Sequence, residues 1–498
     1  MAQLLLLSVF VISTCGLIYE LIAAALASYL LGDSITQFST VIGVYLFSMG
    51  IGSYLSKFLN KNLLEKFIQI EILIGVVGGF SASILFVSFE YVTSFKIILY
   101  SLLSLTGILV GVEIPLLMRI LQTHFEFKDL VSKIFTFDYI GALIASIMFP
   151  LFLVPHLGFV KTAFLFGIIN LLVAVWTLTI FKDKIKWINA HRLSAIFFLL
   201  VLAVGFVESE RIVSFAESAS FQDNVIYAKS TKYQRIVLTK STDDFRLFLN
   251  GNLQFSSKDE YRYHEALVHV GLASIPNPKK VLILGGGDGL AVREVLKYPS
   301  VENITLVDLD PEMTKLFSTN TLLTTLNHNA LNSSKVKVIN TDAFLWLKEN
   351  QEKFDFVIVD FPDPSNYSIG KLYTNTFYKL LKRSIAEGGL GVVQSTSPYV
   401  AKKSYWCIDN TLKSVGFLTT PYHAYVPAFG DWGYILFSTE TFVAPEKFPE
   451  NLKFITADVL HSLMIFPEDM IVQTTEVNKL NNQVLVKHFE EEWANYAH

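Results

Sequence analysis

The chain has 498 residues, of which 52% are hydrophobic and 17% are charged, and its formal net charge is −4. This hydrophobic share excludes an intrinsically disordered chain, and the slightly acidic charge argues against binding of nucleic acid. Cys15 and Cys407 are the only cysteines, which excludes a disulfide framework and a cysteine-rich metal site. Residues 1–207 carry 12 of the 40 Lys and Arg and 10 of the 44 Asp and Glu. We therefore expect a membrane domain over 1–207 and water-soluble domains after it.

The membrane domain is predicted to be an α-helical bundle of about seven transmembrane helices. A helix needs about 20 apolar residues to cross about 30 Å of hydrocarbon. Helices are the expected form because lipid offers no hydrogen-bond partner to an open backbone. The apolar runs cover residues 4–30, 38–59, 67–89, 97–121, 134–155, 159–181 and 191–207.

Several acids lie within these runs, where a carboxylate is costly and usually faces the interior of the bundle. Such acids either join helices as neutral hydrogen-bonded groups or form a cation site or path. Pro115, close to one of these acids, and Pro150 and Pro155, after another, predict broken helices with free backbone carbonyls nearby. The acids are Glu20, Glu71, Glu113 and Asp138.

The charged loops of the membrane domain predict its orientation. Lys and Arg cluster after the second, fourth and sixth apolar runs, at 57–66, 119–133 and 182–192. The positive-inside rule places these loops in the cytoplasm. With seven spans, the rest of the chain would then lie on the outer side of the membrane.

Residues 208–265 are predicted to form a small β-rich domain. Apolar and polar side chains alternate over 221–256, and Asn250-Gly251 is typical of a type I′ hairpin. Residues 259–269 then predict a helix with an acidic first turn.

This helix contains a pattern that superficially resembles a zinc site. His264-Glu265 is followed by His269, so the two histidines are five residues apart and do not share a helix face as a zinc peptidase requires. We therefore expect no metal site here.

Residues 266–440 are predicted to form a Rossmann-like α/β domain with a mostly parallel sheet. An apolar run over 280–284 leads into the glycine-rich loop 285–289, and a helix is expected at 291–296. Glycines allow the backbone to approach a ligand closely at the start of a helix. Three further apolar strands end in Asp308, Asp342 and Asp360.

Acids at the carboxyl ends of parallel strands predict the type of ligand. Each aspartate alone is more often a helix cap, but four of them around a glycine loop favour a nucleoside site. The spacing places Asp308 on ribose hydroxyls, and Asp342 can reach an adenine amino group.

Asp288, inside the glycine loop, narrows the choice of nucleoside. Its charge would repel a phosphate, which argues against dinucleotides. It would also repel the carboxylate of S-adenosylmethionine and attract the bare ammonium of the decarboxylated form. Asp360 and Asp363 lie three residues apart on a turn that Pro362 and Pro364 stiffen.

With these motifs in place, residues 220–440 resemble the spermidine synthase (polyamine aminopropyltransferase) family. The N-terminal bundle resembles the membrane-bound branch, in which a multi-pass domain precedes the synthase. The motifs that carry the resemblance are Tyr233-Gln234, Asn250-Gly251 with Gln254, Asp259-Glu260, Tyr263-His264-Glu265, the loop 285–289, Asp360-x-x-Asp363-Pro364 and Leu372-Tyr373-Thr374.

The resemblance implies that the chain transfers the aminopropyl group of decarboxylated S-adenosylmethionine to putrescine, giving spermidine and methylthioadenosine. On the donor side it implies that Asp288 holds the aminopropyl ammonium and that Asp308, where many members have Glu, takes the ribose. Asp342 takes the adenine, and Gln234 contacts the nucleoside or its propylamine chain. The donor set is Gln234, Gly285, Gly287, Asp288, Asp308 and Asp342.

On the acceptor side the resemblance implies that Asp360 is the general base. Tyr263 and Asp363 orient and deprotonate the diamine, and His264 lines the pocket. Tyr425 resembles an acceptor-side tyrosine, although residues 429–433 depart from the soluble enzymes. A protonated amine cannot attack, so carboxylates must attract it and help remove a proton.

Two other functions fit parts of the sequence. A membrane-attached S-adenosylmethionine methyltransferase explains the sheet but neither Asp288 nor the pair Asp360 and Asp363. A polyamine transporter or sensor with a synthase-like domain that only binds explains the acids of the bundle.

The resemblance further implies a homo-oligomer, a dimer or a tetramer, with no metal or cofactor. The chain should be a multi-pass protein of the cell membrane. Supply of the donor favours a cytoplasmic catalytic domain, whereas the Lys and Arg bias favours the outer side. Residues 441–498 form a C-terminal extension with expected helices near 448–466 and 484–496.

Overall fold

The computed structural model describes residues 2–31, 34–92, 94–122, 125–221 and 223–496. The chain divides into two compact units, Met1–Lys232 and Tyr233–His498. The first unit thus extends past the predicted membrane domain, because the chain continues after residue 207 with helix α8 and strand β1.

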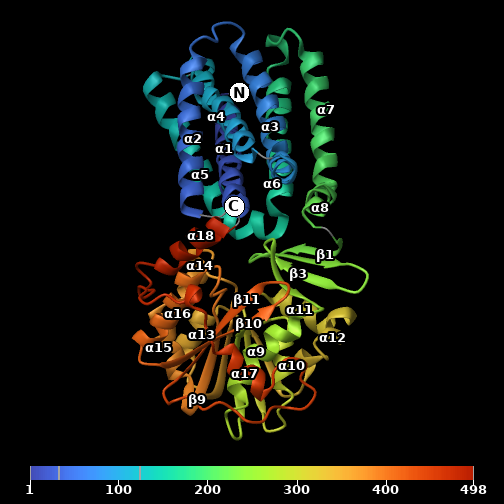
Figure 1. The fold of residues 1–498 in the computed structure, drawn as a ribbon. Coiled ribbons are helices and arrows are strands. Elements are labelled where there is room, and N and C mark those ends of the chain that lie inside the picture. Colours follow the sequence, from blue (N-terminus) through green and yellow to red (C-terminus); the bar gives the residue numbers. More distant parts are fainter. Residues whose placement is uncertain (1, 32–33, 93, 123–124, 222, 497–498) are drawn as a thin grey trace. The chain divides into compact units, whose positions relative to one another are not determined.

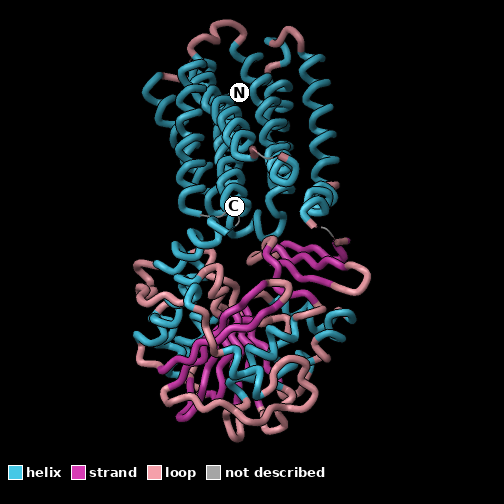
Figure 2. Tube along the Cα trace, in the orientation of Figure 1, coloured by secondary structure: helices cyan, strands magenta, loops and turns pink. Residues whose placement is uncertain are grey.

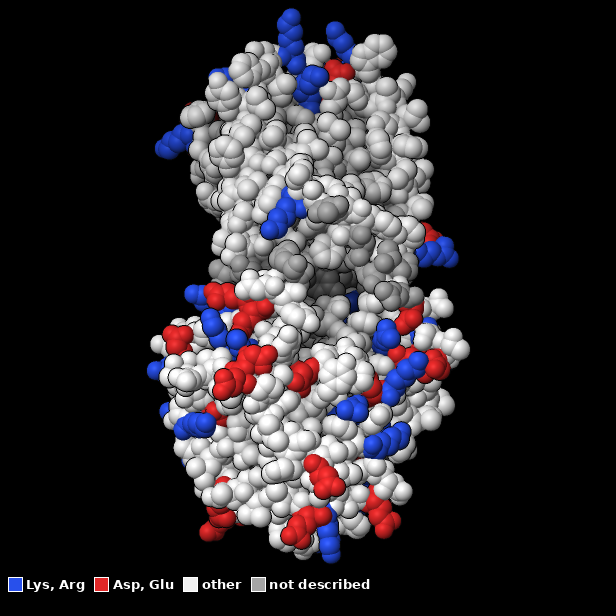
Figure 3. Space-filling model, in the orientation of Figure 1, with Lys and Arg blue, Asp and Glu red and all other residues white. Residues whose placement is uncertain are grey.

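The first unit is a bundle of long apolar helices (Figures 1 and 2). On the face drawn in Figure 3 its surface is largely uncharged, with Lys and Arg mainly near one end. Its elements are α1 (Ala2–Leu31), α2 (Ser34–Ser56), α3 (Leu63–Tyr91), α4 (Phe95–Leu121), α5 (Phe127–Met148), the π-helical η1 (Phe149–Leu153), α6 (Val154–Ile180), η2 (Lys182–Lys184), α7 (Ile188–Val207), α8 (Ser209–Ser220) and β1 (Asn224–Ser230).

Within the described residues, six helical stretches are long and apolar enough to cross a membrane. Seven runs were expected, and the number differs because the fifth and sixth runs lie in one stretch, Phe127–Ile180. A straight helix of these 54 residues would be about 81 Å long, far more than a bilayer needs. Gly158, with φ 71° and ψ 179°, is non-helical and kinks the stretch.

The prolines of the bundle act differently from one another. Pro150 lies in the π-helical turn η1 and Pro155 in the first turn of α6, so the chain stays helical through both prolines and the kink comes later, at Gly158. The predicted break at Pro115 was wrong, because α4 continues through it from Phe95 to Leu121. A proline kinks a helix without ending it when neighbouring helices hold both halves.

Glycines bring α3 and α6 into close contact. A Cβ on Gly75 would lie 3.0 Å from the carbonyl oxygen of Gly167, and one on Gly167 would lie 2.6 Å from that of Gly75. Small residues at such crossings let helix backbones approach each other. This contact places Asn170 of α6 beside Glu71 of α3, as described below.

The second unit begins with an antiparallel meander. Strands β2 (Arg235–Lys240), β3 (Phe245–Leu249) and β4 (Asn252–Ser256) pair in order. Asn250 and Gly251 connect β3 to β4 with φ values of 52° and 81°. Positive φ at both positions is what a type I′ turn requires, so the predicted hairpin is confirmed. Helix α9 (Glu260–Leu272) follows, close to its predicted range.

The main sheet has seven strands in the order β10-β11-β9-β8-β5-β6-β7. The strands from β5 to β9 are parallel to one another, and β10 and β11 add an antiparallel edge. Because β6 and β8 flank β5 on opposite sides, the order of the strands reverses between β5 and β8. Open α/β sheets bind ligands at such a point. The strands are β5 (Lys280–Gly285), β6 (Asn303–Asp308), β7 (Val336–Asn340), β8 (Phe354–Asp360), β9 (Ile385–Gln394), β10 (Leu418–Val426) and β11 (Gly430–Ser438).

Helices pack on both faces of this sheet (Figure 1). Leu282, Leu284 and Val359 belong to a buried cluster that also contains Phe377 of α15 and Ile408 of α16. The helices of this unit after α9 are α10 (Leu290–Val295), α11 (Pro311–Thr319), α12 (Thr321–Leu326), η3 (Ala330–Asn332), α13 (Ala343–Glu349), α14 (Tyr367–Gly370), η4 (Lys371–Tyr373), α15 (Asn375–Arg383), α16 (Lys402–Ser414), α17 (Ala457–Leu463), η5 (Glu468–Met470) and α18 (Val484–Tyr496).

The C-terminal segment is an integral part of the second unit. Backbone amides of residues 453–455 donate hydrogen bonds of 2.8–3.0 Å to the buried carboxylate of Glu265. The side chain of Asn478 donates to the carbonyls of Gly370 and Tyr373. The predicted helix 484–496 is confirmed as α18, whereas the helix expected near 448–466 is limited to α17.

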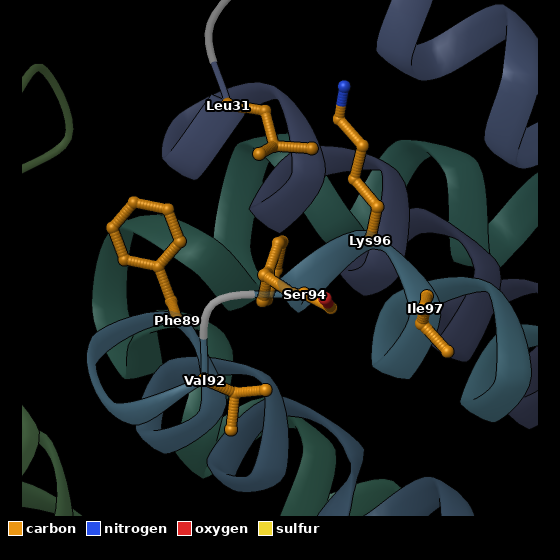
Figure 4. Close-up of a pocket in the computed structure, with 7 residues that line it drawn as sticks. Leu31, Phe89, Val92, Ser94, Lys96 and Ile97 are labelled. Carbon is orange, nitrogen blue, oxygen red and sulfur yellow. The ribbon is translucent and has the colours of Figure 1, made fainter.

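A pocket of about 510 Å³ lies in the first unit at the turn between α3 and α4 (Figure 4). Apolar side chains supply most of its lining, and Lys96 is its one charged residue. It contains none of the acids that the sequence singles out. The lining residues are Leu31, Phe89, Val92, Ser94, Phe95, Lys96 and Ile97.

Candidate active site

Three predicted acids meet at the carboxyl edge of the parallel strands. Gly285, the last residue of β5, pairs with Asp360, the last residue of β8. The backbone N–H of Gly287 donates a hydrogen bond of 3.1 Å to Oδ2 of Asp308, at the end of β6. The glycine loop therefore lies between Asp308 and Asp360.

Two glycines of the loop leave no space for a side chain. A Cβ on Gly285, whose φ is +84°, would lie 2.1 Å from the carbonyl oxygen of Asp360. A Cβ on Gly287 would lie 2.6 Å from Oδ2 of Asp308. The loop thus needs glycine in order to pack against the two strands that carry acids.

Asp308 is fixed by the backbone around it. Its carboxylate accepts hydrogen bonds from the N–H groups of Gly287 and Asp310, at 3.1 and 2.8 Å. Burial raises the pKa of Asp308 to about 6, even though these backbone hydrogen bonds favour the ionised form. Gln234 donates a hydrogen bond of 3.1 Å to Oδ2 of Asp310, which brings this predicted donor residue to the loop after β6.

Asp288 lies two residues before the first residue of α10, and the N-cap position of that helix is Gly289. Oδ1 of Asp288 accepts a hydrogen bond of 2.9 Å from the N–H of Leu290, which fixes the carboxylate in the loop. Burial raises the pKa of Asp288, and the charge of His264 partly offsets this effect. A cationic ligand beside Asp288 would stabilise its ionised form.

Tyr263 and Asp360 form a direct pair. The phenol of Tyr263, on α9, donates a hydrogen bond of 2.6 Å to Oδ1 of Asp360. Burial raises the pKa of Asp360 to about 6, and the charge of Asp288 acts in the same direction. The ring of Tyr263 packs against the rings of Tyr434 and Phe429, with centroids 5.5 and 6.2 Å apart.

Asp363 lies at the end of the turn that follows β8. Thr396 Oγ1 and Gln394 Nε2 contact its carboxylate at 3.4 and 3.5 Å. Burial raises the pKa of Asp363 to about 7. With a pKa near neutrality, this acid can accept or return a proton.

Gln394 connects the turn to the neighbouring strands, and the sequence prediction missed it. Its amide donates to the hydroxyl of Tyr373 at 2.9 Å and to the carbonyl of Phe361, and its Oε1 accepts from Nε1 of Trp432 at 3.2 Å. Gln394 is the last residue of β9. The rule that selected the aspartates, a polar residue at the end of an apolar parallel strand, would have found it.

His264 supplies a positive charge next to the acids. Its Nδ1 lies 2.8 Å from Oε2 of Glu260, and Arg293 forms a further buried ion pair with Glu260 at 2.8 Å. Burial alone would lower the pKa of His264, but the hydrogen bond and charge of Glu260 raise it to about 9. Asp288 and Asp360 also act on His264 electrostatically, so the histidine belongs to the site.

Asp342 and Tyr425 are placed differently from the other predicted residues. Oδ1 of Asp342 caps α13 through the N–H groups of Phe344 and Leu345, and Oδ2 pairs with Nζ of Lys371 at 2.7 Å. Its contact with adenine stays a prediction. Tyr425, on β10, is 59% exposed, so the structure does not bring its side chain to the acids of the site.

The histidines and glutamate of the zinc-like pattern have separate partners. His269 contacts Glu294 and Tyr298, at 2.8 and 2.9 Å, whereas Glu265 binds the backbone of the C-terminal segment. Among the described residues, the structure contains no group of three His, Cys, Asp or Glu that could hold a metal ion.

The chain is similar to known proteins of one family. Residues 260–447 match the model of the spermine/spermidine synthase domain. A polyamine aminopropyltransferase of Leptospira interrogans is 52% identical over 99% of this chain and 99% of its own length. Polyamine aminopropyltransferase 2 of Ralstonia nicotianae is 52% identical over 98% of both chains. The crystal structure of spermidine synthase from Thermotoga maritima aligns with 49% of this chain and 85% of its own, at 28% identity and a TM-score of 0.45.

The two relatives cover the apolar bundle as well as the site, so the similarity is not confined to the catalytic unit. With more than half of all aligned residues identical over nearly the whole length, the chain belongs to the polyamine aminopropyltransferase family.

Proposed function

We propose that this protein transfers the aminopropyl group of decarboxylated S-adenosylmethionine to putrescine, giving spermidine and methylthioadenosine. The observation that carries the proposal is the half-buried group of acids at one edge of the sheet, where Asp308 and Asp360 flank the glycine loop that contains Asp288. Family membership supports the same reaction, because the relatives are named polyamine aminopropyltransferases.

The acids select a positively charged donor. Decarboxylated S-adenosylmethionine carries a sulfonium and an ammonium but no carboxylate. Asp288 attracts that ammonium, whereas the carboxylate of ordinary S-adenosylmethionine would face a buried acid. Asp308, held by two backbone N–H groups, presents a fixed carboxylate for the ribose hydroxyls.

The acceptor side provides the proton chemistry. A primary amine has a pKa near ~10.4 in water and is protonated at neutral pH. Asp360, with a pKa of about 6, is mostly ionised at pH 7 and accepts a proton from the attacking ammonium. Tyr263 fixes the orientation of that carboxylate, and Asp363 binds the diamine on the same side.

The reaction then proceeds as an in-line displacement. The neutral amine nitrogen forms a bond to the aminopropyl carbon next to sulfur, and the carbon–sulfur bond breaks with its electron pair going to sulfur. The sulfonium becomes the neutral thioether of methylthioadenosine, the new secondary nitrogen keeps its two protons as an ammonium, and the proton removed before the attack stays on Asp360. Since the sulfonium is already a good leaving group, alignment of the two substrates supplies most of the acceleration.

The apolar helices suit a multi-pass protein of the cell membrane, and this location is part of the proposal. The catalytic unit forms a dimer or tetramer in the same proposal and uses no metal or cofactor. Donor supply predicts a cytoplasmic catalytic unit and the Lys and Arg distribution predicts the opposite side. A reporter fused after His498, active on one side of the membrane only, distinguishes these two orientations.

The proposed reaction is tested by identifying its products. The purified full-length protein is incubated with decarboxylated S-adenosylmethionine and, separately, putrescine, cadaverine and spermidine, and the products are identified by mass spectrometry. When putrescine is the acceptor, we expect spermidine and methylthioadenosine to form in equal amounts. Transfer of a methyl group from ordinary S-adenosylmethionine, with no aminopropyl transfer, would contradict the proposal.

A further inference from the structure

Two glutamates face each other in the interior of the bundle. Glu71 of α3 and Glu113 of α4 are 0% and 1% exposed, and their carboxyl groups lie within hydrogen-bonding reach of each other. Asn170 of α6, 1% exposed, donates a hydrogen bond of 2.9 Å from Nδ2 to Oε2 of Glu71. Three helices therefore direct polar side chains to one buried point.

The atoms left without a partner at this point are hydrogen-bond acceptors. Among the described residues, Oε1 of Glu71, Oε1 of Glu113 and Oδ1 of Asn170 are buried and have no hydrogen-bond donor. An unpaired buried polar atom costs about 1–3 kcal/mol. A ligand that stabilises this arrangement has to supply donors, and next to two carboxyl groups it has to be a cation.

The surroundings of the pair contain acids and aromatic side chains. The titratable groups of the neighbouring helices within electrostatic range of the pair are Cys15 and Tyr19 of α1, Tyr45 of α2 and Asp138 of α5, and none of these is a base. The described ion pairs include neither glutamate. Any positive charge at this point therefore has to come from outside these side chains.

Tyr19 gives a second indication. It is 2% exposed, its ring packs over Gly78 of α3, where a Cβ would lie 2.5 Å from the ring, and its hydroxyl has no hydrogen-bond partner. Tyr19 lies within electrostatic range of both glutamates, so a hydrogen-bond donor that binds at the pair can also act on its hydroxyl. Metal ions fit less well, since Ca²⁺ takes six to eight oxygen ligands and Mg²⁺ six.

We propose that Glu71, Glu113 and Asn170 form a second amine site, which binds the ammonium group of a protonated primary amine inside the membrane domain. The three N–H donors of one primary ammonium match the three unpaired oxygens. The ligand class rests on the proposed function, which makes diamines and polyamines the substrates and products of the same chain. Asp138, half-buried and within electrostatic range of Glu113, suits the second ammonium of a diamine.

The test counts amine sites on the full-length protein in detergent with radiolabelled putrescine at equilibrium. Wild type should bind two equivalents per chain. The double variant Asp360→Asn/Asp363→Asn should retain the bundle site, and Glu71→Gln/Glu113→Gln should retain the catalytic site. Each double variant should thus bind one equivalent, and the combined variant none. Glu65→Gln, an acid on the same helix that pairs with His191, is the matched control and should bind two.

Two further measurements identify the ligand. Unlabelled methylammonium should compete for the bundle site, whereas tetramethylammonium, which has the same charge but no N–H donor, should not. Asn170→Asp adds a third acid and should tighten putrescine binding at this site at least threefold. Gel filtration and thermal unfolding establish that each variant is folded.

Several outcomes would overturn the inference. These are one equivalent in the wild type, no loss of binding in Glu71→Gln/Glu113→Gln, or equal competition by Na⁺ and methylammonium. Aminopropyl transfer is measured on the same preparations. If the second site binds putrescine but no aminopropyl group is transferred, the proposed function is contradicted and the second site is supported. If transfer is normal but the second site does not bind, the second site is contradicted and the proposed function is supported.

Discussion

The hydroxyl of Tyr263 lies 2.6 Å from Oδ1 of Asp360, although the two residues are 97 positions apart in the chain. Helix α9 carries the phenol of Tyr263, and strand β8 ends in the carboxylate of Asp360. Burial keeps the pKa of Asp360 at about 6, and the phenol, whose pKa burial raises well above its ordinary value, stays a donor. The pair can hold an ionised base ready in an apolar environment.

Asp360→Asn should remove the base while preserving the shape of the site. We expect kcat to fall by about 10²–10⁴, the range that general base catalysis contributes. Binding of methylthioadenosine should change less than threefold, because the nucleoside is expected to contact Asp308 instead. Calorimetry with methylthioadenosine and a turnover assay check both parts, and a variant with full turnover would exclude Asp360 as the base.

Tyr263→Phe should change the pH dependence of the reaction. Asp360 accepts a proton only when ionised, so kcat/KM should rise with pH through its pKa of about 6. The hydrogen bond from Tyr263 lowers the pKa of Asp360, and its removal should move this acidic limb to higher pH by about one unit. Tyr367→Phe, an exposed tyrosine, serves as control. A limb that stays at the wild-type pH would show that the phenol does not act on Asp360.

The sequence predicts the catalytic unit well because strand ends are marked by local residue patterns. The apolar strands β5, β6 and β8 end in Gly285, Asp308 and Asp360, and the structure brings these three strand ends together at one sheet edge. Tyr263 and His264 could be assigned only through the family resemblance. Their contacts with Asp360 and Glu260 depend on how α9 packs on the sheet.

The remaining parts could not be predicted, for physical reasons. Gln394 lies at a strand end, which the rule used for the aspartates covers, but its hydrogen bonds to Tyr373 and Trp432 depend on tertiary packing and have no local signature. Pro115 was expected to break its helix, but neighbouring helices hold α4 continuous. Tyr425 was placed by motif alone, and strand β10 leaves it exposed while Phe429, in the next turn, reaches Tyr263.

Gln394→Leu should weaken acceptor binding more than donor binding. The amide connects the turn at residues 361–363 to Tyr373 and Trp432, and leucine cannot form these hydrogen bonds. With Asp363 less well positioned, we expect the KM for putrescine to rise about 10-fold, the size of one hydrogen bond to a charged group. The KM for the donor should change less than threefold, and an equal rise in both would point to a general loss of structure instead. Gln394→Glu keeps the shape of the side chain but removes its N–H donors. It therefore further separates a loss of Asp363 positioning from a general loss of structure.

Arg293→Met should destabilise the second unit strongly. The guanidinium pairs with Glu260 and Glu294 at 2.8 Å, and all three side chains are at least 92% buried. Its loss leaves Glu260 with His264 alone, and removal of one partner of a buried ion pair costs about 3–5 kcal/mol. The control Lys279→Met breaks an exposed pair with Glu302, which is worth about 0–1 kcal/mol. Thermal unfolding of the two purified variants should therefore show a melting temperature lower by roughly 10 °C for Arg293→Met and nearly unchanged for Lys279→Met. Equal shifts would mean that the buried network does not stabilise the helix that carries Tyr263.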